Sequence, residues 1–145
     1  MSQPDSSTNQ LKTNEISKLQ ILLVEDNITN QNMVSMILKK RGAHVIIANN
    51  GQEALDILTS KNVDVILMDI QMPILDGYQT TQKIRETEIK KSTRTPIIAL
   101  TANALNNERE YCITQGMDGY LCKPFGMQEL LSCITNTIHR VNSQK

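Results

Sequence analysis

Aromatic side chains are scarce in this sequence, which has three tyrosines, one phenylalanine and no tryptophan among its 145 residues. The four are also scattered along the chain, so they cannot form a stacking platform for nucleic-acid bases. No excess of positive charge replaces them, because fifteen basic residues balance fifteen acidic ones and no block of like charge stands out. A sequence-independent hold on a phosphate backbone needs such an excess. We therefore expect no nucleic-acid partner.

Long hydrophobic runs are absent as well. No stretch approaches the roughly 20 apolar residues of a membrane-spanning helix, and the first residues lack the apolar core of a signal peptide. The three cysteines, Cys112, Cys122 and Cys133, are an odd number without metal-ligand spacing. We expect reduced thiols, a cytoplasmic location and no membrane contact by this chain.

Composition divides the chain in two. Residues 1–18 are polar and have the composition of a linker, which predicts a disordered tail. Residues 19–141 carry the apolar runs and have the length of a single domain. The prediction is one folded domain over 19–141.

Short apolar runs alternate with helical patterns throughout this domain. Five runs read as strands: residues 20–26, 44–49, 63–69, 95–101 and 119–124. Five segments between and after them have helical spacing: residues 30–42, 51–61, 77–91, 103–116 and 127–141. The strands are continuously apolar, so both faces of the sheet should be covered. The alternation predicts an α/β fold with a parallel sheet and helices on both faces.

Two of these helical segments allow more detailed expectations. In residues 30–42, Met33, Val34, Ile37 and Leu38 share a helical spacing that predicts a buried stripe, and Gly42 stands where a helix C-terminus needs a left-handed residue. Residues 103–116 have only a thin apolar stripe. We expect that segment to be the most loosely packed helix.

Chemically active residue types fall at the carboxyl ends of the predicted strands, where open α/β sheets bind ligands. Glu25 and Asp26 end the first run, Asp69 the third, Thr101 the fourth and Lys123 the fifth. A lone acid there is commonly a turn or cap residue, but five chemically active residues at four strand ends indicate a shared site. Three adjacent carboxylates repel one another unless a cation such as Mg²⁺ joins them. Mg²⁺ beside a lysine suits a phosphoryl group, and a carboxylate can be its acceptor.

The segments "ILLVEDN", "VILMDIQMPILDGY", "PIIALTA" and "GYLCKPF" closely resemble the receiver (response-regulator) domain of two-component phosphorelays. The resemblance covers about residues 19–140 and is strongest to receivers of hybrid sensor histidine kinases. It implies a flavodoxin-like, five-stranded, doubly wound parallel sheet with strand order 2-1-3-4-5. It also implies a histidine kinase or a histidine-phosphotransfer domain as partner.

The resemblance assigns a role to each strand-end acid. Asp69 is the expected phosphoacceptor, taking a phosphoryl group from a phosphohistidine. Glu25, Asp26 and Asp69, with the backbone carbonyl of Gln71, are the expected ligands of Mg²⁺, and Mn²⁺ is an acceptable substitute.

The other residues near the strand ends would act on the phosphoryl group. Thr101 would donate a hydrogen bond to a phosphoryl oxygen, and Lys123 would pair with its charge. Tyr120 matches the switch aromatic whose orientation follows Thr101, and the Lys123–Pro124 bond is expected to be cis. Gln71 and Asn103 would flank the phosphoryl group and tune its hydrolysis.

Two other classes of function share some of these features. A Mg²⁺-dependent phosphatase with an aspartyl nucleophile uses similar chemistry, but such enzymes usually have the nucleophile and a second acid two residues later at the end of the first strand. Here the first strand ends in two adjacent acids, and the isolated Asp69 follows the third strand. A transcription factor needs a DNA-binding domain, and only four residues follow Val141. We therefore expect a relay module with intrinsic autophosphorylation and autodephosphorylation chemistry rather than an enzyme. Its partner is expected to dock where Ile28, Met33 and Met36 lie beside the carboxyl ends of the strands.

Overall fold

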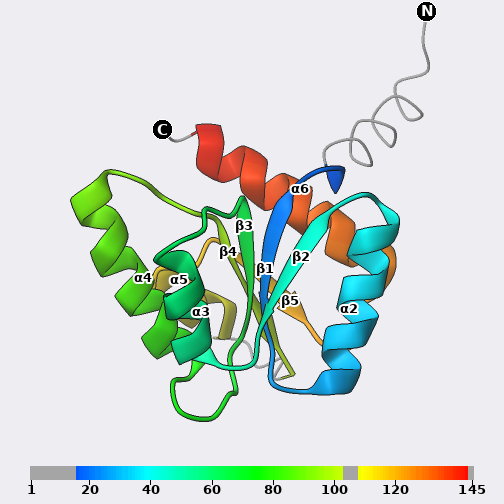
Figure 1. The fold of residues 1–145 in the computed structure, drawn as a ribbon, viewed down its shortest axis with the longest axis horizontal. Coiled ribbons are helices and arrows are strands. Elements are labelled where there is room, and N and C mark those ends of the chain that lie inside the picture. The colour runs from blue at the N-terminus through cyan, green and yellow to red at the C-terminus, as the bar shows by residue number, and fades with distance from the viewer. Residues whose placement is uncertain (1–15, 103–107, 144–145) are drawn as a thin grey trace, which may run out of the picture.

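The computed structural model describes residues 16–102 and 108–143. It shows a twisted sheet of strands enclosed by two layers of helices (Figure 1). The strands are β1 (Gln20–Val24), β2 (His44–Ala48), β3 (Val65–Asp69), β4 (Ile97–Thr101) and β5 (Gly119–Cys122). The helices are α2 (Ile28–Lys40), α3 (Gly51–Leu58), α4 (Gly77–Lys91), α5 (Glu108–Thr114) and α6 (Met127–Ser143).

The sheet has the order β2-β1-β3-β4-β5, and every neighbouring pair is parallel. The predicted fold class and strand order are therefore confirmed. β1 lies between β2 and β3. The chain therefore runs from β1 to β2 on one side and then crosses back to β3 on the other side. In a doubly wound sheet, this reversal opens a crevice at the carboxyl ends of the strands.

Each strand contributes side chains to two separate cores, which explains why the runs are apolar without interruption. Ile21 and Leu23 of β1 point into a core closed by α2 and α6. Leu22 and Val24 point into the other core, which α3, α4 and α5 close. Figure 1 shows the same division, with α2 and α6 on one side of the sheet and the other three helices opposite.

Local signals set the helix ends. Asn27 caps α2 by accepting the N–H of Asn30, and Asp76 forms a capping box with Gln79 at the start of α4. Gly42 follows α2 with a φ of +88°, which confirms its predicted role, because a left-handed residue lets the next amides reach the last carbonyls of the helix.

Some packing differs from the sequence expectations. Ile16, assigned to the polar tail, is fully buried in the core beside α2, so packing begins at least three residues before the predicted boundary. Of the four residues predicted to form the buried stripe of α2, Val34 and Leu38 are buried and Ile37 is partly buried against the core, but Met33 is 44% exposed. Of the segment 103–116, the structure describes only the part from Glu108 onward, where α5 buries a single residue, Cys112.

An ion-pair network lies at the edge where the strands begin. The Asp118 carboxylate, just before β5, contacts the Arg85 and Arg94 guanidinium groups, each at 2.6 Å. The same carboxylate accepts the Ile97 N–H at the start of β4 (3.0 Å), and Arg85 also pairs with Glu88. Two cations thus balance two anions, and the contacts tie α4 to β4 and β5. Within the described residues, no helix combines the length and the hydropathy needed to cross a membrane.

Candidate functional site

The carboxyl ends of β1, β3, β4 and β5 bring Glu25, Asp26, Asp69, Thr101 and Lys123 to one edge of the sheet, which we call the rim. Backbone hydrogen bonds fix two of the positions. Glu25 continues the β1 ladder by donating its N–H to the Ala48 carbonyl (3.0 Å), and the Lys123 N–H donates to the Thr101 carbonyl (2.7 Å). The register places Asp69 beside Leu100, one residue before Thr101.

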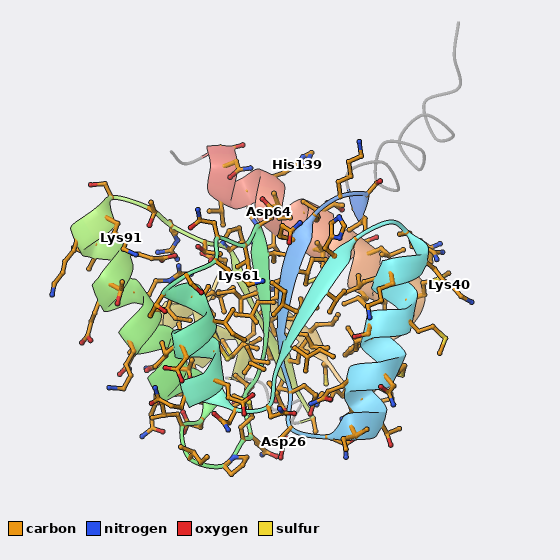
Figure 2. All side chains as sticks on the ribbon, viewed as in Figure 1. Asp26, Lys40, Lys61, Asp64, Lys91 and His139 are labelled. Carbon is orange, nitrogen blue, oxygen red and sulfur yellow. The ribbon has the colours of Figure 1, made fainter. Side chains whose placement is uncertain are left out.

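The three acids of the rim form a cluster. One carboxylate oxygen from each of Glu25, Asp26 and Asp69 lies within 4.8 Å of the other two. Glu25 and Asp69 are 2% and 6% exposed, whereas Asp26 is exposed and marks this edge in Figure 2. Hard carboxylate oxygens converging from one solvent-accessible side suit Mg²⁺, which keeps several waters when bound. The donor set therefore fits the predicted metal.

Among the described residues, the ammonium group that forms ion pairs with this cluster is that of Lys123. Lys123 Nζ lies 3.1 Å from Glu25 Oε1 and 3.6 Å from Asp69 Oδ2. The other oxygen of Asp69, Oδ1, accepts the Gln71 N–H at 3.2 Å. Three carboxylates against one ammonium leave an excess of negative charge. The role of the Gln71 carbonyl as a metal ligand stays a prediction.

Burial and charge together perturb Asp69. Its burial is the larger cause and the Glu25 carboxylate the second, and they raise its pKa from 3.8 to about 7 although Lys123 and the Gln71 N–H lower it. Without a cation, Asp69 is therefore partly protonated near neutral pH. A metal ion at the cluster would restore the carboxylate, which is the nucleophilic form.

The buried Glu25 is held by residues that the sequence analysis did not single out. The Asn27 N–H donates to Glu25 Oε2 (3.2 Å), and Gln31 Nε2 donates to the Glu25 backbone carbonyl (2.5 Å) and to Asn49 Oδ1 (2.8 Å). Asn27 could have been identified as a cap, but its second contact depends on how β1 and α2 meet. These contacts fix Glu25 before any ligand arrives.

The two switch residues lie on neighbouring strands. Thr101 is 2% exposed, and its hydroxyl donates to Glu108 Oε1 at the start of α5 (3.2 Å). Tyr120, on β5, is half-buried and packs against the core that α5 helps to close. The Lys123–Pro124 bond is cis, as predicted. Asn103 lies outside the described residues.

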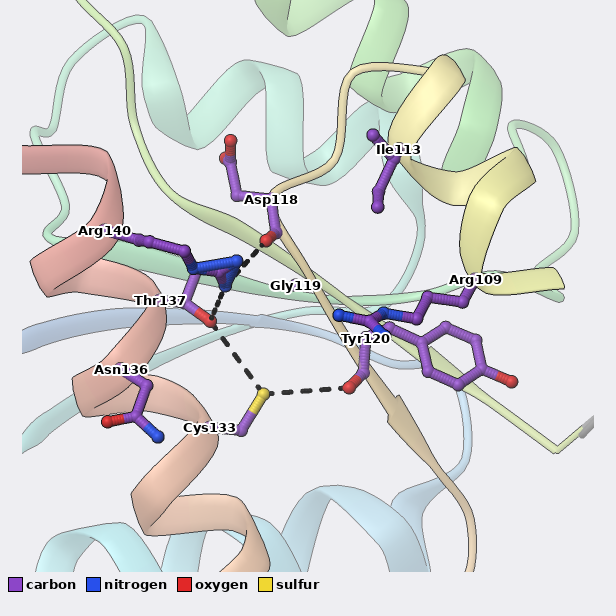
Figure 3. Close-up of a pocket in the computed structure, with 9 residues that line it drawn as sticks. All are labelled: Arg109, Ile113, Asp118, Gly119, Tyr120, Cys133, Asn136, Thr137 and Arg140. Carbon is purple, nitrogen blue, oxygen red and sulfur yellow. Dashed lines mark hydrogen bonds between the residues drawn. The ribbon is translucent and has the colours of Figure 1, made fainter. Parts of the chain in front are cut away.

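A hollow of about 470 Å³ lies away from the rim, against β5 and between α5 and α6 (Figure 3). Arg109 and Arg140 line it from the two helices, and the Cys133 thiol donates to the Tyr120 carbonyl there (3.8 Å). None of the three clustered acids lines this hollow. Tyr120 is the residue that links it to the predicted switch.

Comparison with known families gives one clear result. The model of the response regulator receiver domain matches residues 21–135. Histidine kinase 5 of Arabidopsis thaliana is 36% identical over 149 residues, covering 86% of this chain and 16% of that protein. Hybrid signal transduction histidine kinase I of Dictyostelium discoideum is 42% identical over 123 residues, covering 81% of this chain and 7% of that protein. The chain thus spans a small part of these relatives.

Solved structures give the same picture. The receiver domain of a Pseudomonas aeruginosa PAO1 sensor histidine kinase, crystallised with a magnesium ion in its active-site cleft, is 42% identical with a TM-score of 0.76; the match covers 85% of this chain and 99% of that one. The receiver domain of the Saccharomyces cerevisiae response regulator Ssk1, solved with the histidine phosphotransfer protein Ypd1, is 32% identical with a TM-score of 0.78, covering 86% and 92%.

Proposed function

Because this chain belongs to the response regulator receiver domain family and is a phosphoacceptor module of a phosphorelay, we propose that Asp69 is the residue that takes up the phosphoryl group. One observation carries the assignment. Asp69 ends β3 with its carboxylate between an acidic cluster and the Lys123 ammonium. Asp69 therefore has metal ligands beside it and a cation on which phosphoryl charge can rest.

The transfer step uses the residues of the rim. A carboxylate oxygen of Asp69 attacks the phosphorus of a phosphohistidine, the new O–P bond forms as the P–N bond breaks, and the imidazole nitrogen leaves with the electron pair and then takes a proton. The Gln71 N–H orients the carboxylate through Oδ1. Lys123 already lies 3.6 Å from Oδ2, so it is placed to pair with a phosphoryl oxygen.

Glu25, Asp26 and Asp69 are the residues that would hold Mg²⁺. When bound, the ion offsets the negative charge of the carboxylates and of the phosphoryl oxygens. An all-oxygen donor set also accepts Mn²⁺, so we propose that Mn²⁺ supports the same reaction.

The test is the intact mass of the protein after incubation with acetyl phosphate and Mg²⁺. We expect one added phosphoryl group, removed by hydroxylamine as an acyl phosphate is, and none on Asp69→Asn. Asp64→Asn is the matched control, since Asp64 precedes the same strand at the opposite edge, where it accepts the Gln20 N–H (2.7 Å; Figure 2). Phosphorylation of Asp69→Asn to the level of the unaltered protein would refute the assignment.

We further propose that the module completes single slow cycles and is not a phosphatase for free phosphoesters. The paired acids follow β1 while Asp69 ends β3, whereas such phosphatases usually have the nucleophile and a second acid together at the end of the first strand. Steady phosphate release from a phosphomonoester, with many turnovers per protein molecule, would contradict this proposal.

The phosphoryl donor or acceptor is proposed to be a histidine kinase or a histidine-phosphotransfer domain that docks over α2. Ile28, Met33 and Met36 of this helix are 68%, 44% and 58% exposed, and Ile28 opens α2 two residues after Asp26. An apolar surface beside the rim would let a partner's histidine reach Asp69. Such a relay belongs in the cytoplasm, and we propose that location for the chain, without nucleic-acid or membrane contacts.

A further inference from the structure

The Thr101 hydroxyl already donates a hydrogen bond in this structure. It donates to Oε1 of Glu108, the first residue of α5, at 3.2 Å. The proposed function, on which this inference rests, requires the same hydroxyl to donate to a phosphoryl oxygen on Asp69. A threonine hydroxyl carries one proton and can make one such donation at a time. Glu108 and the phosphoryl group therefore compete for Thr101.

We propose that Glu108 is a positioning residue that holds the Thr101 hydroxyl away from the phosphoryl site until Asp69 is phosphorylated. A carboxylate is a strong acceptor, since hydrogen bonds to an ionised group are shorter and stronger than neutral ones. None of the ion pairs among the described residues involves Glu108. The Thr101 hydroxyl is thus one of the neutral hydroxyl partners of this carboxylate, together with that of Tyr78.

Charge makes the two states of Thr101 exclusive. If the hydroxyl lay at an ordinary hydrogen-bond length from a phosphoryl oxygen and still 3.2 Å from Glu108 Oε1, the two anionic oxygens could be no more than about 6 Å apart. Like charges at that separation repel. Phosphorylation must therefore displace the Glu108 carboxylate from Thr101.

The helix that carries Glu108 is weakly anchored. Among its residues Glu108–Thr114, only Cys112 is buried, and Tyr111 and Ile113 are 48% and 54% exposed. A segment with so few buried contacts moves at low cost. When phosphorylation releases Glu108 from Thr101, α5 can therefore change position. This helix borders Tyr120 and the hollow of Figure 3.

The test measures the affinity for beryllofluoride, a phosphoryl mimic, in the presence of Mg²⁺. Glu108→Ala removes the competing acceptor and should bind the mimic about 5-fold or more tightly than the unaltered protein. Glu108→Gln keeps an acceptor without the charge and should fall between the two. Glu110→Ala is the matched control, because Glu110 is an exposed acid in the same first turn and its loss should leave the affinity unchanged.

A double-mutant cycle separates positioning from a general effect on the fold. In a Thr101→Ala background no hydroxyl remains to be held, so Glu108→Ala should no longer change the affinity. Mg²⁺ affinity without the mimic should be equal in the unaltered protein and Glu108→Ala. An equal gain in both backgrounds, or no gain in either, would overturn the role of Glu108. Failure of the unaltered protein itself to bind the mimic, or binding by Asp69→Asn, would instead count against the proposed function.

Discussion

At the carboxyl ends of the strands, three carboxylates face the Lys123 ammonium group. At the opposite edge, by contrast, Asp118 and Glu88 are matched by Arg85 and Arg94. Both regions bury acidic groups: the side chains of Asp69 and Asp118 are each 8% exposed. They differ in whether the buried charge is compensated within the protein.

The balanced network stabilises the fold, whereas the unbalanced cluster is suited to binding a ligand. The Asp118 carboxylate is satisfied by two guanidinium groups and the Ile97 N–H, as a buried ion must be if it is not to destabilise the fold. The rim leaves negative charge uncompensated, and the pKa of Asp69 rises to about 7, mainly through burial. Groups with perturbed pKa values cluster at functional sites, where a bound cation can supply the positive charge that the protein lacks.

Asp118→Ala should have the largest effect on stability. It removes the anion shared by Arg85, which keeps its ion pair with Glu88, and by Arg94, whose side chain is 44% exposed. The free energy of unfolding should therefore fall by about 3 kcal/mol in urea titrations. The folded fraction should still accept a phosphoryl group at Asp69, because the network lies at the far edge. Asp64→Ala, which removes one exposed hydrogen bond at that edge, should cost about 1 kcal/mol. An equal loss for both variants would mean that the network is not a stabilising centre.

Magnesium should stabilise the protein through the rim. At 100 times its dissociation constant, a ligand of the folded state adds about 2.7 kcal/mol to the free energy of unfolding, which differential scanning calorimetry would detect as a higher melting temperature. Asp26→Asn should remove most of this gain, whereas Asp64→Asn should keep it. A magnesium shift that survives Asp26→Asn would place the ion elsewhere.

In metal-free buffer, the rim should make stability depend on pH. The pKa of Asp69 is about 7 in the folded protein and 3.8 ordinarily, so between these values the folded state binds more protons than the unfolded state. The contribution of Asp69 to stability is therefore complete below about pH 4 and is lost as pH rises through 7. Urea titrations of the unaltered protein and Asp69→Asn should show this loss as a growing difference across the range. Parallel curves would refute the raised pKa.

The smallest effect on stability is expected from a pair of exposed isoleucines at the two edges. Ile28→Glu beside the rim and Ile89→Glu near the far end of α4, where the side chains are 68% and 78% exposed, should each change stability by about 0.5 kcal/mol or less. Ile28→Glu should slow transfer from a phosphorylated histidine-phosphotransfer domain but leave phosphorylation by acetyl phosphate intact. Ile89→Glu should alter neither rate. A parallel fall of both reactions in Ile28→Glu would assign Ile28 to the site and not to docking.

The sequence by itself determined the fold class and the membership of the rim. Continuous apolar runs alternating with helical patterns specify a covered parallel sheet. Residues at the carboxyl ends of parallel strands must meet at one edge whatever the details of packing. Glu25, Asp69 and Lys123 could therefore be brought together from their positions alone, and the structure places them within ion-pair or ligand distance.

Only the tertiary structure decided which side chains pair across the chain. Asp118 meets Arg85 across 33 positions, and Thr101 donates to Glu108 instead of to solvent. The burial of Ile16 and the exposure of Met33 likewise depend on where each helix crosses the sheet. Such contacts arise from the relative placement of whole elements, which no local periodicity encodes, because periodicity specifies a buried face but not the neighbour that covers it.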